Sequence, residues 1–382
     1  MDAFEARLRA VDAAKLTPWV RSLLEAPDYV IDTVRLEPLT AGFSEGTVGT
    51  GGAYRYSGQG HSARGKQPWS LVLKMLRMVE GVGGTAPRDW NYRRRETLAY
   101  RSGLLDDLPG GIAAPRCLAV ETPVDGETWI WLEEARQISP RWDMAQYGRV
   151  ARHLGQFNGA YLAGRPIPER RWFTRGRVRS WLDLSRVELD DLPAFLASRT
   201  APHWVTGKQA ERVSALWAQR APLLKRFDAL PRCLCHHDAF PRNLFAGPDK
   251  TIAIDWQIMG SGVVGEELMP LVGVSLHFLH MSPKQARELE AVVLDGYTSG
   301  LRDAGWHGDE RLVRLGFRLA TGLFCGVACV GMWKSLADEE RRDRSAEILG
   351  GSIEEVLSTW RELQDYFLDL TDEAIALSET LN

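Results

Sequence analysis

The pattern of apolar and polar positions differs between the two ends of the chain. The first 25 residues have the spacing of an amphipathic helical region, and helical spacing returns at 87–105. Short apolar runs bounded by turn residues predict strands at 69–76, 114–122 and 127–135. Beyond about residue 140 the pattern is mostly helical, and only the stretch 232–258 looks like β-structure.

This order predicts a small β-rich part followed by a larger helical part. We expect the first part, residues 1–134, to hold the N-terminal helix and the β-rich lobe. Residues 135–382 are expected to form the helical lobe, with its one β-like patch inside it. A chain of two such lobes is expected to bind its ligand in a cleft between them.

Composition and charge narrow the class of protein. The chain has 382 residues, is 45% hydrophobic and carries a formal net charge of −3. The chain has no overall positive charge that would favour binding to a nucleic acid or to an anionic membrane. The longest uncharged apolar run, 319–333, falls short of the roughly 20 residues that span a bilayer, so we expect a buried helix there.

Two further features favour a cytoplasmic protein. The N-terminus lacks the apolar core of a secretory signal. The five cysteines form no regular disulfide framework, as is typical of a reducing compartment.

The segment "CHHDAFPRNLF", residues 235–245, has the highest density of chemically active side chains. A zinc site is disfavoured, because structural zinc sites take their ligands in well-separated pairs. Here the candidate ligands are adjacent, and neighbours on a strand point to opposite faces. Those candidates are Cys233, Cys235, His236 and His237.

Oxygen ligands give a more consistent interpretation of the same segment. Asp238 is followed five residues later by Asn243, and Asp255 ends the apolar run "TIAID". One base, two oxygen ligands for Mg²⁺ and nucleotide phosphates are the components of phosphoryl transfer. The alternative is that Asp238 and Asn243 only stabilise a tight turn.

The segments "HHDAFPRN" and "IAIDWQ" resemble the aminoglycoside phosphotransferase family, which has a protein-kinase-like fold. His236, Asp238 and Asn243 match its H-G-D-x-x-x-x-N loop, and Asp255 matches its metal-binding aspartate. The resemblance implies a two-lobed α+β fold, with a β-rich N-lobe and a mainly helical C-lobe. It also implies that Asp238 and His236 belong to the catalytic loop and that Asn243 and Asp255 hold Mg²⁺. His237 departs from the pattern, because the family usually has glycine there.

The resemblance assigns a nucleotide site to the first part of the chain. Lys74, in the strand 69–76, matches the lysine that reaches the phosphates of ATP or GTP, and Glu96 matches the helix acid that holds it. A lysine at this position could also be the charge of an edge strand. The glycine-rich stretch 40–49 lies where the phosphate-covering loop is expected, with Gly42, Ser44 and Gly46 as candidates.

Several weaker correspondences follow from the same resemblance. Glu133 and Ala135 occupy the linker whose backbone binds adenine in the family. Glu267 matches an acid that supports the catalytic loop, and Asn158 lies near a family histidine. For Asn158 we prefer a packing role.

The sequence says least about which residues bind the acceptor substrate and what that substrate is. Arg242, His277 and Trp333 are candidates for substrate contact, although each is also consistent with a core or solvated position. An aminoglycoside is polycationic and requires an acidic pocket. We therefore expect a hydroxylated metabolite, antibiotic or sugar as the small-molecule substrate, which leaves a role in antibiotic resistance open.

The expected activity is Mg²⁺-dependent transfer of the γ-phosphoryl group of ATP or GTP to a hydroxyl, with Asp238 as the base. The protein is expected to act as a monomer or homodimer. The alternative is a nucleotide-binding pseudokinase or regulatory scaffold. The loss of any of Lys74, Asp238, Asn243 or Asp255 would favour that alternative, and all four are present. A protein kinase is disfavoured, because no A-P-E-like segment follows Asp255.

Overall fold

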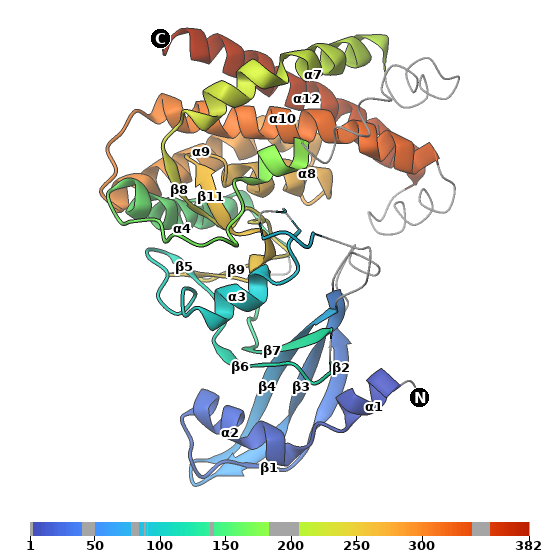
Figure 1. Ribbon diagram of the computed structural model, residues 1–382, viewed down its shortest axis with the longest axis vertical. Coiled ribbons are helices and arrows are strands. Elements are labelled where there is room, and N and C mark those ends of the chain that lie inside the picture. Colours follow the sequence, from blue (N-terminus) through green and yellow to red (C-terminus); the bar gives the residue numbers. More distant parts are fainter. Residues whose placement is uncertain are drawn as a thin grey trace. The chain divides into compact units, whose positions relative to one another are not determined.

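A computed structural model gives the fold of the chain in two compact units (Figure 1). Unit 1 comprises 1–83, 96–106 and 114–136, and unit 2 comprises 84–95, 107–113 and 137–382. The residues that the structure describes are 3–39, 50–77, 84–87, 89, 91–124, 126–137, 141–182, 206–337 and 352–381.

Unit 1 is built on one antiparallel sheet of order β1-β3-β4-β7-β6, with β2 paired to β3. Its strands are β1 (Val30–Ile31), β2 (Arg35–Leu39), β3 (Thr50–Ser62), β4 (Gly65–Arg77), β6 (Cys117–Glu121) and β7 (Glu127–Glu133). The strands expected at 69–76, 114–122 and 127–135 correspond to β4, β6 and β7.

The alternation along β4 explains which face of this sheet is buried. Leu71, Leu73 and Met75 are buried in a core shared with α1 (Ala3–Arg9) and α2 (Ala13–Leu24). Because side chains alternate between the two faces of a strand, Lys74 projects from the opposite face.

The helix expected over 87–105 is shorter in the structure, where α3 spans Arg95–Arg101. The expectation is wrong for the described residues before Arg95 and for 102–105, which form turns. Asp89 accepts a hydrogen bond from the Ala86 N–H group at 2.9 Å, and Asn91 accepts one from Gly84 at 2.9 Å. Such side-chain bonds to the backbone compete with helical hydrogen bonds and favour turns.

Unit 2 is mainly helical, with two small sheets. Its longer helices are α4 (Met144–Leu162), α7 (Gly207–Asp228), α9 (Ala286–Asp303), α10 (Glu310–Ala337) and α12 (Ile353–Glu379). A π-helix spans Pro270–Val274, α8 spans Ser275–His277, and 3-10 turns span Trp256–Ile258 and Pro283–Gln285. The first sheet has three strands in the order β5 (Ile112–Ala113), β10 (Thr251–Ala253) and β9 (Leu244–Ala246). The second sheet pairs β8 (Arg232–Cys235) with β11 (Gly260–Val263).

Helices α4 and α9 pack closely against each other in this unit (Figure 1). A Cβ atom added at Gly159 would lie 2.8 Å from the Ala304 Cβ, so the small residue permits the approach. Asn158 of α4 is fully buried and donates a hydrogen bond to the Leu234 carbonyl at 2.7 Å. The helix pair therefore fixes the position of β8, from which the segment 236–243 emerges.

The α+β class is confirmed, with one β-rich unit and one mainly helical unit. The boundary expected at 134/135 remains a prediction about independent lobes. The apolar run 319–333 lies within α10 as expected. Among the described residues, no helix is long and apolar enough to cross a bilayer.

Candidate functional site

The loop 236–243 connects β8 to β9, and Asp255 directly follows Ile254 at the end of β10. In the β9–β10 hairpin Leu244 pairs with Ala253, and the Ile254 N–H group donates to the Asn243 carbonyl at 2.9 Å. This pairing brings Asn243 and Asp255 to the same end of the hairpin. Asp255 has a left-handed backbone, with φ of 62°.

Asp238 has its carboxylate held from two sides. Asn243 Nδ2 donates to Oδ2 at 2.7 Å, and Arg177 Nη1 donates to Oδ1. Arg177 also donates to the His237 carbonyl at 2.6 Å. The Asp238 side chain remains 17% exposed. Since an ionised carboxylate offers about four lone-pair directions, two donors leave acceptor capacity for a further proton.

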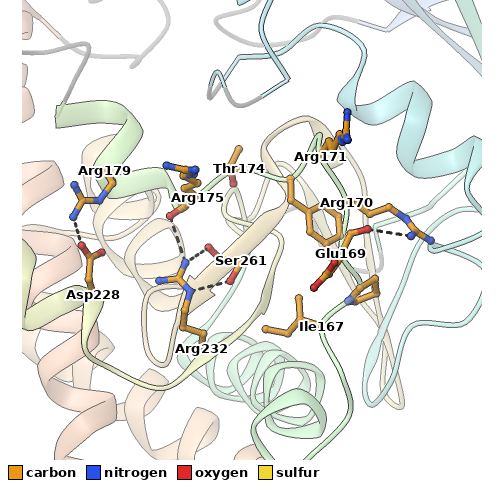
Figure 2. Close-up of a pocket in the computed structure, with 12 residues that line it drawn as sticks. Ile167, Glu169, Arg170, Arg171, Thr174, Arg175, Arg179, Asp228, Arg232 and Ser261 are labelled. Carbon is orange, nitrogen blue, oxygen red and sulfur yellow. Dashed lines mark hydrogen bonds and ion pairs between the residues drawn. The ribbon is translucent and has the colours of Figure 1, made fainter.

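Arg177 is the main residue that the sequence analysis missed. It begins a helical segment, 177–182, within a run rich in arginine, and its guanidinium lies 4.9 Å from the Phe324 ring centre. The same run lines a separate cavity of about 920 Å³ (Figure 2). Arginine density was the only sequence signal, and it does not indicate which arginine meets Asp238, 61 positions away.

His236 uses both ring nitrogens inside the fold. Nε2 lies 2.8 Å from the Ile254 carbonyl, which can only accept, so Nε2 carries the proton. Nδ1 then accepts from the Asp238 N–H group at 3.1 Å. Burial lowers the pKa of His236, in keeping with a neutral ring. His236 therefore links the loop to the strand that precedes Asp255, and its geometry suits positioning rather than proton transfer.

His237 occupies the position where glycine was expected, and its φ of 68° explains that preference. Its ring is fully buried and lies beside Gly262, where an added Cβ would be 2.6 Å from His237 Cε1. The same Cβ would be 2.7 Å from the Cys235 sulfur. His237 and Gly262 thus form a matched pair, in which the glycine makes room for the imidazole.

We expect Gly262→Ala to destabilise the protein by roughly 1–3 kcal/mol, because overpacking forces neighbouring atoms to move. In a His237→Gly background the same substitution should cost measurably less, since the ring is gone and only the contacts of the added Cβ with Cys235 and Glu266 remain. Urea unfolding of the four proteins measures this coupling. Equal costs of Gly262→Ala in the two backgrounds would contradict the matched pair.

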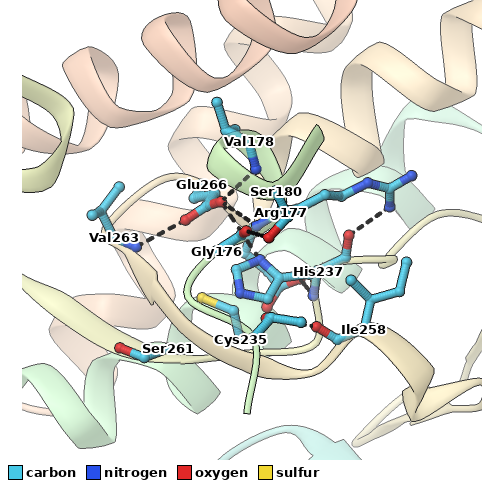
Figure 3. Close-up of polar contacts among 12 residues, drawn as sticks. Gly176, Arg177, Val178, Ser180, Cys235, His237, Ile258, Ser261, Val263 and Glu266 are labelled. Carbon is cyan, nitrogen blue, oxygen red and sulfur yellow. Dashed lines mark hydrogen bonds and ion pairs between the residues drawn. The ribbon is translucent and has the colours of Figure 1, made fainter. Parts of the chain in front are cut away.

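Two buried glutamates, Glu266 and Glu267, accept hydrogen bonds from backbone N–H groups in and beside the loop 236–243, and Figure 3 shows the contacts of Glu266. Glu267 accepts from the N–H groups of His236 at 2.6 Å and His237 at 2.8 Å, as expected for an acid that supports the loop. Glu266 accepts from the N–H groups of Arg177 at 3.0 Å and Val263 at 3.1 Å. Burial raises the pKa of each glutamate to about 7. Glu266 thus anchors the backbone that carries the Arg177 guanidinium to Asp238.

The donor set at Asn243 and Asp255 suits a hard cation. Asn243 is buried and donates through Nδ2 to both the Asp238 carboxylate and the Asp238 carbonyl, so Oδ1 is the atom with which it could bind a metal ion. An amide oxygen and a carboxylate are ligands that Mg²⁺ accepts, with phosphates and water completing its shell. No three His, Cys, Asp or Glu side chains gather as metal ligands in the described part of the chain.

Unit 1 contains the lysine and glutamate proposed for the nucleotide. Lys74 Nζ lies 2.7 Å from Glu96 Oε2, and their side chains are 15% and 1% exposed. Glu133 ends β7, and its N–H group donates to the Arg116 carbonyl at 3.0 Å. Ala135 follows β7 and is half-buried. Gly42, Ser44 and Gly46 lie outside the described residues.

The three candidates for substrate contact are placed differently. The Arg242 guanidinium lies 4.6 Å from the Phe278 ring centre, beside the loop 236–243. His277 stacks on Trp360 at 5.1 Å between ring centres. Trp333 belongs to α10, and its side chain lies outside the described residues.

Solved structures of low sequence identity resemble the chain. An amicoumacin kinase is 13% identical, with a TM-score of 0.48 over 93% of this chain and 96% of that one. A spectinomycin phosphotransferase is 13% identical, with a TM-score of 0.47 over 92% and 99%. A choline/ethanolamine kinase family protein from Mesorhizobium loti is 15% identical, with a TM-score of 0.43 over 91% and 99%.

A comparison with curated proteins finds no match. The model of the phosphotransferase enzyme family matches residues 71–307, which is more than half of the chain and includes Lys74, Glu96, Asp238, Asn243 and Asp255. This match confirms the resemblance seen in the loop 236–243. The chain belongs to the phosphotransferase enzyme family and is a phosphotransferase that acts on an alcohol group.

Proposed function

We propose that the protein transfers the γ-phosphoryl group of ATP or GTP to a hydroxyl of a small molecule, with Asp238 as the base. One observation carries the proposal. The Asp238 carboxylate is held by Arg177 and Asn243 at the end of the hairpin that also presents Asp255. A carboxylate fixed in this way, with acceptor capacity left over, suits the reception of a proton.

In the proposed reaction, Asp238 orients the acceptor hydroxyl and takes its proton. The hydroxyl oxygen forms a bond to the γ-phosphorus, the bond from that phosphorus to the β,γ-bridging oxygen breaks, and the nucleoside diphosphate leaves with the electron pair. Asn243 positions Asp238 through its amide nitrogen. His236 keeps the loop in register with the β10 strand.

Two residues would hold Mg²⁺ through oxygen atoms, Asn243 by its amide and Asp255 by its carboxylate. When bound, the ion offsets negative charge that develops on the phosphates. Lys74 is proposed to contact the α- and β-phosphates. The buried Glu96 carboxylate, 2.7 Å away, fixes the lysine ammonium and limits the rotamer entropy that Lys74 would lose on binding.

Arg177 is proposed as a positioning residue for Asp238. Arg177→Gln should lower kcat roughly tenfold to a hundredfold with little change in the KM for the nucleotide, because misplacement of the base by about 1 Å has an effect of this size. Added guanidinium ion at low concentration should partly restore kcat in Arg177→Ala, a result that a loss of packing alone would not give.

Arg179→Gln is the matched control for this prediction. Arg179 belongs to the same helical segment, is partly exposed and pairs with Asp228 instead of Asp238. Its substitution should leave kcat within about twofold of the wild type. An Arg177→Gln enzyme with wild-type kcat would contradict the positioning role.

The activity itself is tested with a panel of hydroxylated sugars, hydroxy acids and antibiotics. Release of ADP or GDP that depends on one class of acceptor, with a product heavier by one phosphoryl group, would support the proposal. Nucleotide binding without transfer to any acceptor would instead favour a regulatory scaffold. Phosphorylation of protein rather than of a small molecule would also contradict the proposal.

A further inference from the structure

A cavity of about 460 Å³ adjoins the loop 236–243 and includes two of its residues, Pro241 and Arg242. Among the described residues, the cavity is lined by Gln137, Arg141, Trp142, Tyr147, Pro241, Arg242, Leu279 and His280. All of these residues belong to unit 2. Arg242 directly precedes Asn243, so the cavity lies beside the residue that holds the Asp238 carboxylate.

The lining is cationic and rich in donors. Its described lining residues include two guanidinium groups, from Arg141 and Arg242, and neither an aspartate nor a glutamate. Arg242 is partly buried against Phe278, so its charge is less screened by water than a surface arginine. A guanidinium offers five N–H donors in a planar fork that matches a carboxylate or a phosphate.

A second observation indicates that the cavity takes a polar ligand. Trp142 is 8% exposed, and its buried Nε1 atom has no hydrogen-bond partner in the structure. An indole nitrogen can only donate, and a buried donor without a partner is costly. Trp142 also packs edge-on against Tyr147, with ring centres 5.2 Å apart, which fixes the indole.

Gln137 supplies a hydrogen-bond acceptor to a cavity whose other polar groups are mainly donors. Its Nε2 atom donates to the Leu244 carbonyl at 3.1 Å, and its buried Oε1 atom has no partner in the structure. A ligand that satisfies this cavity must therefore offer acceptors to the guanidinium and indole groups and a donor, such as a hydroxyl, to Gln137.

From this arrangement we infer that the cavity, here called the Arg141/Arg242 pocket, binds an anionic group of the acceptor. The inference rests on the proposed function and names its substrate class: a hydroxylated carboxylate or phosphate ester, such as a sugar acid or a sugar phosphate. A polycationic aminoglycoside would bring ammonium groups against two guanidinium groups, which disfavours binding. The phosphates of the nucleotide are the other source of an anionic group.

The second arginine-rich cavity supplies a matched control (Figure 2). It is lined by Arg170, Arg171, Arg175, Arg179 and Arg232 among others, and by no residue of the loop 236–243. Arg171 is exposed there, and Figure 2 shows its guanidinium directed away from Arg232 and Ser261. Arg171→Gln therefore removes the same charge as Arg242→Gln without touching the Arg141/Arg242 pocket.

The first arm measures binding without nucleotide, so that it does not depend on transfer. Gluconate and glucose 6-phosphate are titrated against glucose, and the indole N–H signals are followed by NMR, with Trp142→Phe identifying the Trp142 signal. We expect the anionic ligands, and not glucose, to move that signal. Affinity should fall about tenfold or more in Arg242→Gln, because a charge-assisted hydrogen bond is lost, and should be unchanged in Arg171→Gln.

The second arm separates the two sources of the anionic group. With the best acceptor from the panel, Arg242→Gln should lower kcat/KM for the acceptor and leave the KM for the nucleotide within about twofold. The reverse pattern would overturn the inference and assign the pocket to the nucleotide. Anions that leave the Trp142 signal unmoved, or that bind Arg242→Gln as well as wild type, would also overturn it. Failure of transfer alone would contradict only the proposed activity.

Discussion

Asp238→Asn is expected to lower kcat by about a thousandfold, within the range of 10² to 10⁴ that a positioned base contributes. The amide is nearly the same size as the carboxylate, so the loop 236–243 should keep its shape. It cannot accept a proton at neutral pH, and only one of its two terminal atoms can accept a hydrogen bond. Nucleotide-dependent phosphorylation of the best acceptor measures the effect.

Asp228→Asn is the control for this substitution. Asp228 is partly exposed and pairs with Arg179, outside the loop 236–243. It should retain kcat within about twofold, and both variants should bind the nucleotide as the wild type does. A kcat of Asp238→Asn within tenfold of the wild type would remove Asp238 from the role of base.

Arg95→Leu is expected to cost about 3–5 kcal/mol of unfolding free energy, the largest stability effect that we anticipate. Arg95 is fully buried and donates to the carbonyls of Trp172 and Gln257, at 2.5 and 2.7 Å, and to those of Pro87 and Asp89. Burial lowers the pKa of Arg95 to about 10, so the guanidinium stays charged at neutral pH. Leucine fills part of the volume and leaves those carbonyls without their donor.

Urea unfolding followed by circular dichroism measures this loss. Arg101→Leu is the control, because Arg101 is exposed at the other end of the same helix, α3. It should change the unfolding free energy by less than about 0.5 kcal/mol. A loss below about 1 kcal/mol in Arg95→Leu would show that the carbonyls find other partners.

The parts of the site that the sequence predicted are those set by local order. Lys74 sits on a strand whose alternating burial is visible in the sequence, and Glu96 follows on the next helix. The loop 236–243 and Asp255 are joined by a short hairpin, so their proximity follows from a few turn residues. The α+β order and the helix at 319–333 were predictable for the same reason.

The parts that were missed depend on contacts between distant segments. Arg177 meets Asp238 across 61 positions, and Arg95 meets Gln257 across 162. No periodicity or motif records such pairings, because they arise only when the chain packs. The shorter α3 has the same origin, since the side chains of Asp89 and Asn91 bind nearby backbone groups instead of leaving them to a helix.

His237 lies between these cases. The sequence identified it as a departure from the glycine of the family, and the left-handed backbone explains why glycine suits the position. Gly262, on strand β11, leaves the space that the His237 ring occupies. This contact could not be seen without the structure.

The central claim is that Asn243 and Asp255 form the metal and nucleotide site of a phosphotransferase. The most direct test is thermal stabilisation of the wild type, Asp255→Ala and the control Asp249→Ala by MgATP and MgGTP. Asp249 is exposed in the β9–β10 turn. A ligand at about 100 times its Kd adds about 2.7 kcal/mol to native stability. We predict a metal-dependent rise in Tm that Asp249→Ala keeps and Asp255→Ala loses. An equal rise in Asp255→Ala, or no rise with either nucleotide in folded wild-type protein, would contradict the claim.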